Sequence, residues 1–157
     1  MLDIRSATPA DVNLLVAHRI AMFEAMGRET PEARAAMGRT FAAWLAPRLA
    51  DGRYMSWIAS DAARPVASAG LMLLDWPPVP HDPDGTTRGY LLNIFVEPDY
   101  RRRGLASQLV DRCMEETRRR NIRVVTLHAS QDGRAVYEKI GFHAGNEMQF
   151  WNPVDQL

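Results

Sequence analysis

The chain opens on a short alternation of apolar and polar residues, and the spacing then changes to that of a helix. Residues 2–6, LDIRS, alternate as a half-buried strand does. Thr8 then has the character of a helix N-cap, with Pro9 at the first helical position and Asp11 three residues after the cap. The pattern predicts a strand followed by a helix that extends to about Met26.

A second helix and two strands are predicted next. The Thr-Pro pair at 30–31 repeats the helix-start pattern. Proline cannot donate the backbone hydrogen bond that a helix interior requires, so we expect Pro47 to end this helix at about Leu45. Residues 54–60 and 65–75 are mostly apolar and are joined by a polar turn, SDAARP, which predicts a strand pair.

The second half of the chain alternates strands with helices. Residues 76–88, WPPVPHDPDGTTR, are rich in proline, aspartate and glycine and predict a loop. Residues 89–96, GYLLNIFV, are almost continuously apolar, as a central strand is. Residues 121–129 predict another strand, 130–140 a short helix, and 147–151, EMQFW, a last strand. Between these strands an apolar stripe at helical spacing predicts a helix that contains Leu105, Leu109, Cys113 and Thr117.

The order of elements indicates an α/β fold. Two strand-helix-strand crossovers in the second half require some parallel pairing, whereas the hairpin-like first half favours antiparallel pairing. The length, 157 residues, is that of one ordinary domain, so we expect residues 1–157 to form a single mixed α/β sandwich.

Charge and cysteine content exclude several classes. Nineteen basic and nineteen acidic residues balance, so net charge gives no reason to expect a nucleic-acid or membrane partner. Cys113 is the only cysteine, and no Cys or His spacing is typical of a metal site, so we expect no disulfide and no metal. The charged start at Asp3 and Arg5 argues against a signal peptide, and no apolar run approaches a membrane span. A cytoplasmic protein is the expectation.

Three consecutive arginines, 101–103, stand directly before Gly104 and the apolar helix. The first amide groups of a helix lack internal partners and the helix dipole is positive there, so a phosphate can bind. Arginine supplies forked donors for phosphate oxygens. The run matches neither the Walker loop nor the three-glycine dinucleotide pattern. Taken alone, the hexapeptide is a weak signal, because solvated surface charge is the alternative explanation.

Two motifs together identify a family resemblance. FVEPDYRRRGLA, from a strand end into a helix start, and VYEKIGF at 136–142 resemble the Gcn5-related N-acetyltransferase (GNAT) superfamily. The resemblance covers 89–150 well, and before that only the order of elements agrees. It implies a mostly antiparallel, splayed central sheet flanked by helices, and acetyl-CoA as co-substrate. It also raises the expectation of a homodimer.

The resemblance assigns cofactor contacts residue by residue. It implies that the strand edge at 94–96 pairs with the pantetheine arm, because two strands part there. Arg102 stands at a variable position, where it reaches the 3′-phosphate or faces water. Ser130 and Gly133 replace the asparagine and alanine that are common in the family, which puts those side-chain contacts in doubt. The implied cofactor residues are Ile94, Phe95, Val96, Arg101, Arg102, Arg103, Gly104, Leu105, Ala106 and Ser130, those around Gly104 acting largely through backbone amides.

The chemistry requires a neutral amine, a stabilised carbonyl oxygen and a protonated leaving thiolate. Tyr137 matches the family's tyrosine near the sulfur and is the proposed general acid, although a tyrosine at a helix-sheet interface is also an ordinary packing residue. Asn93 and His128 are the substrate-facing candidates, the first through a water and the second at a strand end. Further candidates for the base are Asp75 and Glu97.

The acceptor is expected to be a small amine or an amino-acid-like compound. Apolar residues of the first two helices and the loop 76–88, including His81, are candidates for its pocket, although helix packing explains most of them. Protein or peptide acetylation and a non-catalytic acyl-CoA-binding module are the alternatives. A second arginine run at 118–120 lies at a helix end, where positive charge favours the dipole, and interleaved aromatic residues are lacking, so no nucleic-acid partner is expected.

Overall fold

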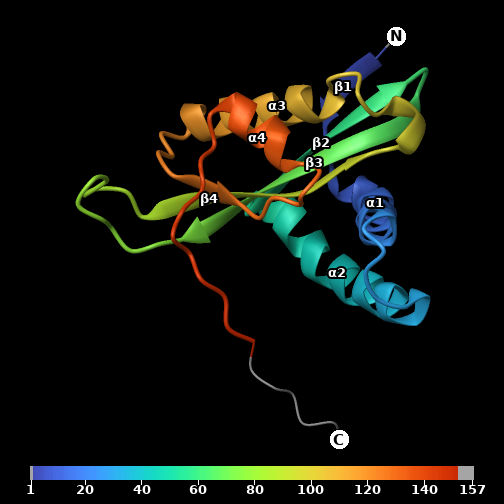
Figure 1. Cartoon of the computed structure of the whole chain (residues 1–157), viewed down its shortest axis with the longest axis horizontal. Coiled ribbons are helices and arrows are strands. Elements are labelled where there is room, and N and C mark those ends of the chain that lie inside the picture. Colours follow the sequence, from blue (N-terminus) through green and yellow to red (C-terminus); the bar gives the residue numbers. More distant parts are fainter. Residues whose placement is uncertain (1, 152–157) are drawn as a thin grey trace, which may run out of the picture.

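A computed structural model describes residues 2–151, which form one five-stranded sheet with helices on both faces (Figure 1). The strands lie side by side in chain order, the first four antiparallel and the last parallel to its neighbour. This confirms the expected mixed, mostly antiparallel sheet. The strands are β1 (Leu2–Ser6), β2 (Tyr54–Asp61), β3 (Arg64–Asp75), β4 (Thr87–Val96) and β5 (Val125–Leu127).

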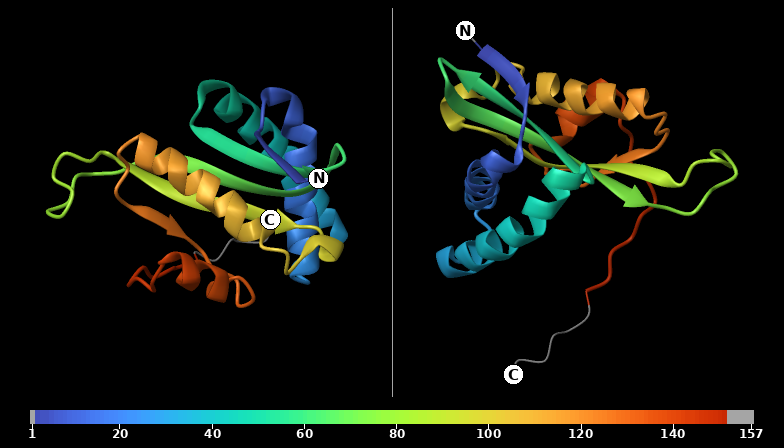
Figure 2. Two further views of the ribbon diagram at one scale, coloured as in Figure 1. Left: turned by 90° about the horizontal axis from the view of Figure 1, so that it is seen from above. Right: turned by 180° about the vertical axis from the view of Figure 1, so that it is seen from behind.

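The helices form two layers. α1 (Val12–Ala25) and α2 (Pro31–Asp51) cover one face of the sheet, whereas α3 (Leu105–Arg119) and α4 (Arg134–Ile140) cover the other (Figure 2). Two short 3₁₀ turns, η1 (Pro9–Asp11) and η2 (Pro98–Tyr100), lead into α1 and towards α3.

Each face of the sheet has its own core, because successive strand residues point to opposite sides. Leu91 and Cys113 belong to the α3 side, and Leu45 and Ile58 belong to the α2 side. Cys113 is completely buried, and burial raises the pKa of its thiol to about 12. Cys113 therefore packs in the core, as its place in the apolar stripe predicts.

The predicted helix starts are present. The Thr8 amide donates to the Asp11 carboxylate at 2.7 Å, and the two guanidinium nitrogens of Arg5 donate to the same carboxylate at 2.9 and 2.7 Å. At α2, the Ala33 amide donates to the Thr30 hydroxyl at 3.2 Å. Side chains thus satisfy amides that the helix geometry leaves without partners.

The expected end of the second helix at Leu45 is wrong, because α2 continues through Pro47 to Asp51. Packing outweighs the lost hydrogen bond here. Leu45 is fully buried, and the Arg48 guanidinium donates to the Trp44 carbonyl at 2.8 Å within the disturbed turn.

The expected last strand at 147–151 is also wrong, since the structure has no regular element there. A strand needs a neighbour to pair with its backbone groups, and alternation alone does not supply one. The side chains of Met148, Phe150 and Trp151 are 92%, 83% and 83% exposed. The predicted helix at 130–140 begins as a turn and becomes helical only at Arg134.

We predict that Asp11→Asn destabilises the protein by about 1 kcal/mol at neutral pH, because it removes the carboxylate that accepts from the Thr8 amide in the capping box. Hydrogen bonds from Arg5 hold the pKa of Asp11 well below its usual value. A lowered pKa in the folded state gives stability that is present above the unfolded pKa, about 4, and declines as the pH falls below it. Urea unfolding of both proteins should therefore show a stability difference that narrows from pH 5 to pH 2. A difference that stays constant would contradict this account.

Candidate functional site

The sheet opens between β4 and β5. β5 pairs with β4 only from Gly89 to Leu91. Beyond Leu91, no strand among residues 2–151 pairs with this side of β4, while the other side continues to pair with β3 as far as Val96. The backbone of residues 92–96 therefore presents an edge inside the molecule, where a ligand can form the hydrogen bonds of a missing strand.

A β-bulge lies on this edge. Gly70 is opposite Leu92 and Ser68 is opposite Phe95, so β4 contributes one residue more than β3 over the same length. Asn93 takes up the extra length with φ +55°, a left-handed conformation that asparagine tolerates. The bulge interrupts the alternation, so that Leu92 and Asn93 both contact the α1–α2 side.

The bulge divides the predicted residues of β4 between the two faces. Ile94 and Val96 pack against the core on the α3–α4 side. Phe95 points the other way and its ring lies 4.9 Å from the ring of His18 on α1. The backbone edge at 94–96 is therefore flanked by side chains of both layers.

The start of α3 stands next to the end of β4. Gly104 has φ +76°, and the first helical hydrogen bond runs from the Gln108 amide to the Gly104 carbonyl at 3.1 Å. The amides of residues 105–107 precede this bond, whereas the Arg101 amide already donates to the Pro98 carbonyl. A Cβ at Gly104 would meet only the Gln108 side chain, at 3.9 Å, so backbone conformation rather than crowding favours glycine here.

Two of the three arginines at this helix start are held by neighbours. Arg101 donates from Nε to the Val96 carbonyl at 3.1 Å, which ties the loop to the end of β4. The Arg103 guanidinium lies 4.9 Å from the centre of the Tyr100 ring. Arg102 has φ +59° and is exposed. Leu105 is buried, so only its backbone is available to a ligand, while Ala106 is partly buried in the first turn.

Tyr137 lies on α4, half-buried against the same core as Ile94 and Val96. Burial raises the pKa of its phenol, so the hydroxyl stays protonated at neutral pH. Ser130 accepts a hydrogen bond from the Gly133 amide at 3.1 Å, in the turn that precedes α4, whose N-cap is Gly133. A Cβ at Gly133 would lie 3.1 Å from Tyr137 Cε2, so glycine at this position leaves room for the ring.

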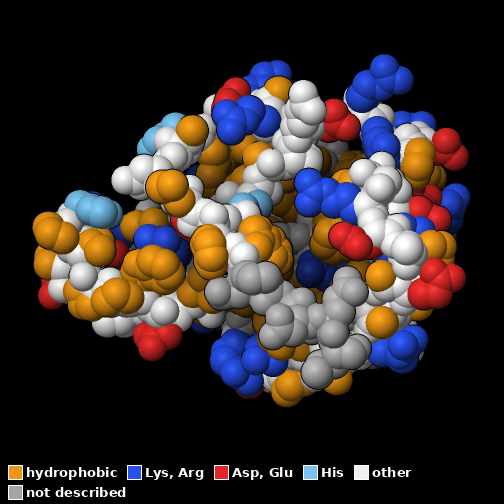
Figure 3. All heavy atoms as spheres, turned by 60° about the horizontal axis from the view of Figure 1, so that its bottom comes forward, with side chains coloured by type: hydrophobic (Ala, Val, Ile, Leu, Met, Phe, Trp, Pro, Cys, Tyr) orange, Lys and Arg blue, Asp and Glu red, His pale blue; other side chains and the backbone are white. Residues whose placement is uncertain are grey.

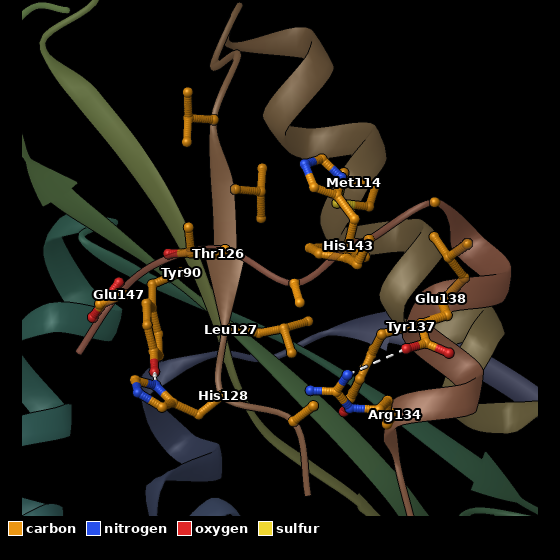
Figure 4. A pocket seen from close by; sticks show the side chains of 18 of the residues that line it. Tyr90, Met114, Thr126, Leu127, His128, Arg134, Tyr137, Glu138, His143 and Glu147 are labelled. Atoms are coloured by element: carbon orange, nitrogen blue, oxygen red, sulfur yellow. Dashed lines mark hydrogen bonds and ion pairs between the residues drawn. The ribbon is translucent and has the colours of Figure 1, made fainter. Parts of the chain in front are cut away.

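His128 follows β5 at the mouth of a cavity of about 760 Å³ that runs along this strand beside α4 (Figure 4). Its Nδ1 is hydrogen-bonded to the Tyr90 hydroxyl, and its Nε2 to the Gln149 side chain. Both ring nitrogens are thus engaged within the protein. In Figure 4, Tyr90 and His128 point towards each other, apart from Tyr137 and Arg134 on α4.

The remaining candidates for the base lie elsewhere. Glu97 forms an ion pair with Arg64 of β3. Asp75 is opposite Thr87, at the far end of the β3–β4 pair from the bulge. The loop after Asp75 projects beyond the sheet (Figure 1), and His81 on it lines the cavity along β5.

A second cavity, of about 430 Å³, lies on the opposite face between α1, α2 and the sheet. The sequence analysis missed its one charged residue, Arg19 of α1, because a single arginine in a helical pattern is indistinguishable from a solvated one. Arg19 donates to the Asn93 side-chain oxygen, and the Asn93 amide donates to the Tyr54 hydroxyl at 2.7 Å. The walls are Arg19, Met37, Thr40, Phe41, Trp44, Met72 and Leu92.

Comparison with known proteins identifies the family. The sequence model of the acetyltransferase (GNAT) family matches residues 18–142, so the chain belongs to this family. A GCN5-related N-acetyltransferase from Ralstonia eutropha is 37% identical and has a TM-score of 0.91, with 99% of this chain and 100% of that chain covered. A search of the curated proteins found no match.

Two further solved structures extend the comparison. A predicted acetyltransferase from Clostridium acetobutylicum, solved with acetyl-CoA, is 30% identical with a TM-score of 0.89, over 97% of this chain and 96% of that one. An aminoglycoside acetyltransferase from an uncultured soil sample is 19% identical with a TM-score of 0.71, over 99% of each chain. The second likeness concerns the fold alone.

Neither a metal-binding cluster nor a membrane-spanning helix is present among the described residues. Across residues 2–151, no group of three or more His, Cys, Asp or Glu side chains is arranged to hold a metal ion. Within the same part of the chain, the helices are too short or too polar to cross a bilayer.

We predict that Asn93→Leu costs about 2 kcal/mol or more of stability. The substitution leaves two buried polar groups, on Arg19 and Tyr54, without their partner and places a branched side chain at positive φ. Asn93→Gly keeps the backbone conformation and loses only the side chain, so urea unfolding of both variants separates the two contributions. Equal stability of Asn93→Leu and the parent protein would show that the hydrogen bonds contribute nothing.

Proposed function

We propose that the protein is an acetyl-CoA-dependent N-acetyltransferase whose acceptor is the primary amine of a small, amino-acid-like molecule. The parting of β4 and β5 after Leu91, next to the start of α3 at Gly104, carries this proposal. It places a free strand edge and a set of free helix amides side by side, and each suits a different part of coenzyme A.

The residues present fit this co-substrate. The amides of residues 105–107 point out of the helix start and suit the diphosphate, with Arg101, Arg102 and Arg103 supplying positive charge nearby. The edge at 94–96 suits the amide groups of the pantetheine arm. Ser130 keeps a hydroxyl proton free to donate, because its oxygen acts as the acceptor in the hydrogen bond from Gly133.

The transfer forms a C–N bond between the acetyl carbonyl carbon and the amine, and breaks the thioester C–S bond. The amine loses a proton and the leaving thiolate gains one. Backbone amides at the bulge are suited to stabilise the carbonyl oxygen as it becomes negative. Tyr137 is suited to protonate the sulfur, because its raised pKa keeps the phenol protonated.

The geometry reduces the number of candidates for the base that accepts the amine proton. His128, Glu97 and Asn93 all have partners within the protein, and Asp75 lies at the far end of the sheet. A route through water bound near Asn93 is the interpretation that we retain, because this residue adjoins both the strand edge and the cavity under α1 and α2.

Two alternatives differ in the acceptor or in the chemistry. A protein or peptide substrate needs an open groove for an extended chain, whereas the cavity beside Asn93 has the size of a small-molecule site. A non-catalytic acyl-CoA-binding module has no use for Tyr137 in the proposed role of an acid. These observations favour a small acceptor and a catalytic protein.

Three further proposals concern the location of the protein, its oligomeric state and nucleic-acid binding. We propose a cytoplasmic enzyme, active as a homodimer, without a nucleic-acid partner. The second arginine run supports the last point, because Glu116 forms ion pairs with Arg119 and Arg120 at 2.5 and 2.6 Å and neutralises part of its charge.

We predict that Gly104→Val lowers the affinity for coenzyme A about tenfold or more, because a β-branched residue is strained at φ +76° and its rearrangement displaces the helix amides. Gly52→Val is the matched control. Gly52 has φ +79° at the end of α2 and has open space around it, so the strain is similar but remote from the site. Calorimetry should show lost affinity only for Gly104→Val. Equal affinities in the two variants would refute this placement of the diphosphate.

We predict that Tyr137→Phe lowers kcat about a hundredfold or more while the dissociation constant for coenzyme A stays unchanged, because only the acid is lost. The rate is measured as thiol release with the fastest amine of a panel of primary amines. A variant with full activity would show that Tyr137 only packs against Phe142, whose ring is 6.2 Å away. Absence of turnover with every amine in the parent protein, despite tight binding of acetyl-CoA, would favour the non-catalytic alternative.

A further inference from the structure

Arg19 is held firmly on the inner side of α1. Its guanidinium lies 5.0 Å from the centre of the Phe23 ring and 4.8 Å from that of the Phe41 ring. One terminal nitrogen donates to the Asn93 side-chain oxygen. Its Nε is buried and has no hydrogen-bond partner in the structure. The side chain is thus fixed in orientation but is not saturated as a donor.

The positive charge of Arg19 has no counter-ion in the described part of the chain. No carboxylate among residues 2–151 forms an ion pair with it, in contrast to Arg5, which is paired with Asp11. Tyr54 does not supply a negative charge, because burial raises the pKa of its phenol and keeps it neutral. Burial of an unpaired charge is costly, and in proteins such charges are paired or neutralised. Arg19 is therefore suited to bind a ligand that carries a negative charge.

The cavity beside this charge is otherwise apolar. Figure 3 views the molecule from the side of α1 and α2 and shows hydrophobic side chains gathered around a hollow, with a positively charged side chain recessed among them. Apart from Arg19 and Thr40, the walls consist of hydrophobic side chains, and two of them, Met37 and Met72, are adaptable in shape. Such a site accommodates a hydrophobic body that carries one negative group.

Arg19 lies close to the strand edge at which the proposed transfer occurs. Arg19 is one hydrogen bond away from Asn93 in the bulge, and Leu92 forms a wall of the cavity. A carboxylate held by Arg19 therefore lies within a few atoms of the strand edge at which the proposed transfer occurs. In an α-amino acid the carboxylate and the amine share one carbon, so this short separation suits that class of molecule.

We propose that the acceptor is an α-amino acid with a hydrophobic side chain, whose carboxylate is bound by Arg19 and whose side chain fills the cavity between α1 and α2. This assignment rests on the proposed acetyl transfer for its biological meaning. Binding of the amino acid can be tested separately, without any turnover. The α-amine points towards the bulge at Asn93, where it attacks the acetyl carbonyl and the thioester bond breaks, as described above.

The first experiment needs no variant. Calorimetry in the presence of coenzyme A compares L-phenylalanine, L-leucine and L-methionine with 2-phenylethylamine, which lacks the carboxylate, and with glycine, which lacks the side chain. We expect the three hydrophobic amino acids to bind about ten- to a hundredfold more tightly than 2-phenylethylamine, as for a hydrogen-bonded charge pair. Glycine should bind most weakly. Equal or tighter binding of 2-phenylethylamine would overturn the proposal.

The second experiment compares Arg19→Met with Arg112→Met. Arg112 is exposed on α3, on the opposite face of the sheet, and serves as the matched control. Thermal unfolding checks that both variants fold. Arg19→Met should bind L-phenylalanine and 2-phenylethylamine equally, whereas Arg112→Met should keep the preference for the acid. A preference that survives in Arg19→Met would overturn the role of this residue.

Thiol release with the same ligands separates this inference from the proposed function. Amino-acid binding that depends on Arg19, without thiol release, would support the carboxylate site and refute acetyl transfer to these amines. Thiol release with amines irrespective of a carboxylate would support acetyl transfer and overturn the inference.

Discussion

β4 contains one residue more than β3 over the same length, and this bulge determines which side chains of β4 face each layer of helices. In a regular strand Leu92 and Asn93 would point to opposite faces, and the polar amide would enter the α3 core. Because Asn93 adopts a left-handed conformation, its side chain instead reaches Arg19 and Tyr54. Gly70 on β3 completes the arrangement, since a Cβ there would lie 2.0 Å from the Tyr54 hydroxyl oxygen.

The two faces of the sheet supply different halves of the proposed reaction. On the α3–α4 side, the start of α3 and Tyr137 flank the free edge of β4 and suit coenzyme A. On the α1–α2 side, a hydrophobic cavity with one uncompensated charge suits the acceptor. The backbone of the bulge is common to both sides, and in the proposed reaction the two substrates meet there. On this proposal the fold separates recognition of the two substrates and brings their reacting atoms together.

The sequence predicts correctly those elements that are determined by residues close together in the chain. The caps at Thr8 and Thr30, the apolar strand that becomes β4 and the stripe of α3 were all recognisable in the sequence. The phosphate-type loop before Leu105 was recognisable because the arginines, the glycine and the helix start are contiguous. The sequence predictions fail where contacts with residues distant in the sequence determine the structure. Pro47 was expected to end a helix that packing against the sheet sustains, and residues 147–151 were expected to form a strand although no neighbour pairs with them.

The acceptor side was the least predictable part of the site for the same reason. Arg19 and Asn93 are 74 positions apart, and neither lies in a recognisable motif. The sequence identifies Asn93 as a substrate-facing candidate but does not predict its partners, Arg19 and Tyr54. Arg19 points towards the sheet because α1 crosses the bulged strand β4, and this crossing is visible only in the structure.

The bulge also constrains how this chain can change in length during evolution. Loss of Asn93 would remove the bulge without exchanging faces, because Leu92 and Phe95 already lie on the α1–α2 side, but Arg19 and Tyr54 would lose the amide that joins them. Loss of Ile94 with the bulge retained would instead exchange faces, so that Phe95 would leave His18 and Val96 would turn away from the α3 core. Residues can be inserted in the long hairpin loop after Asp75 without such an exchange, because the strands on either side keep their pairing. Variation in length should therefore accumulate in that hairpin, while the number of residues in β4 is inherited unchanged.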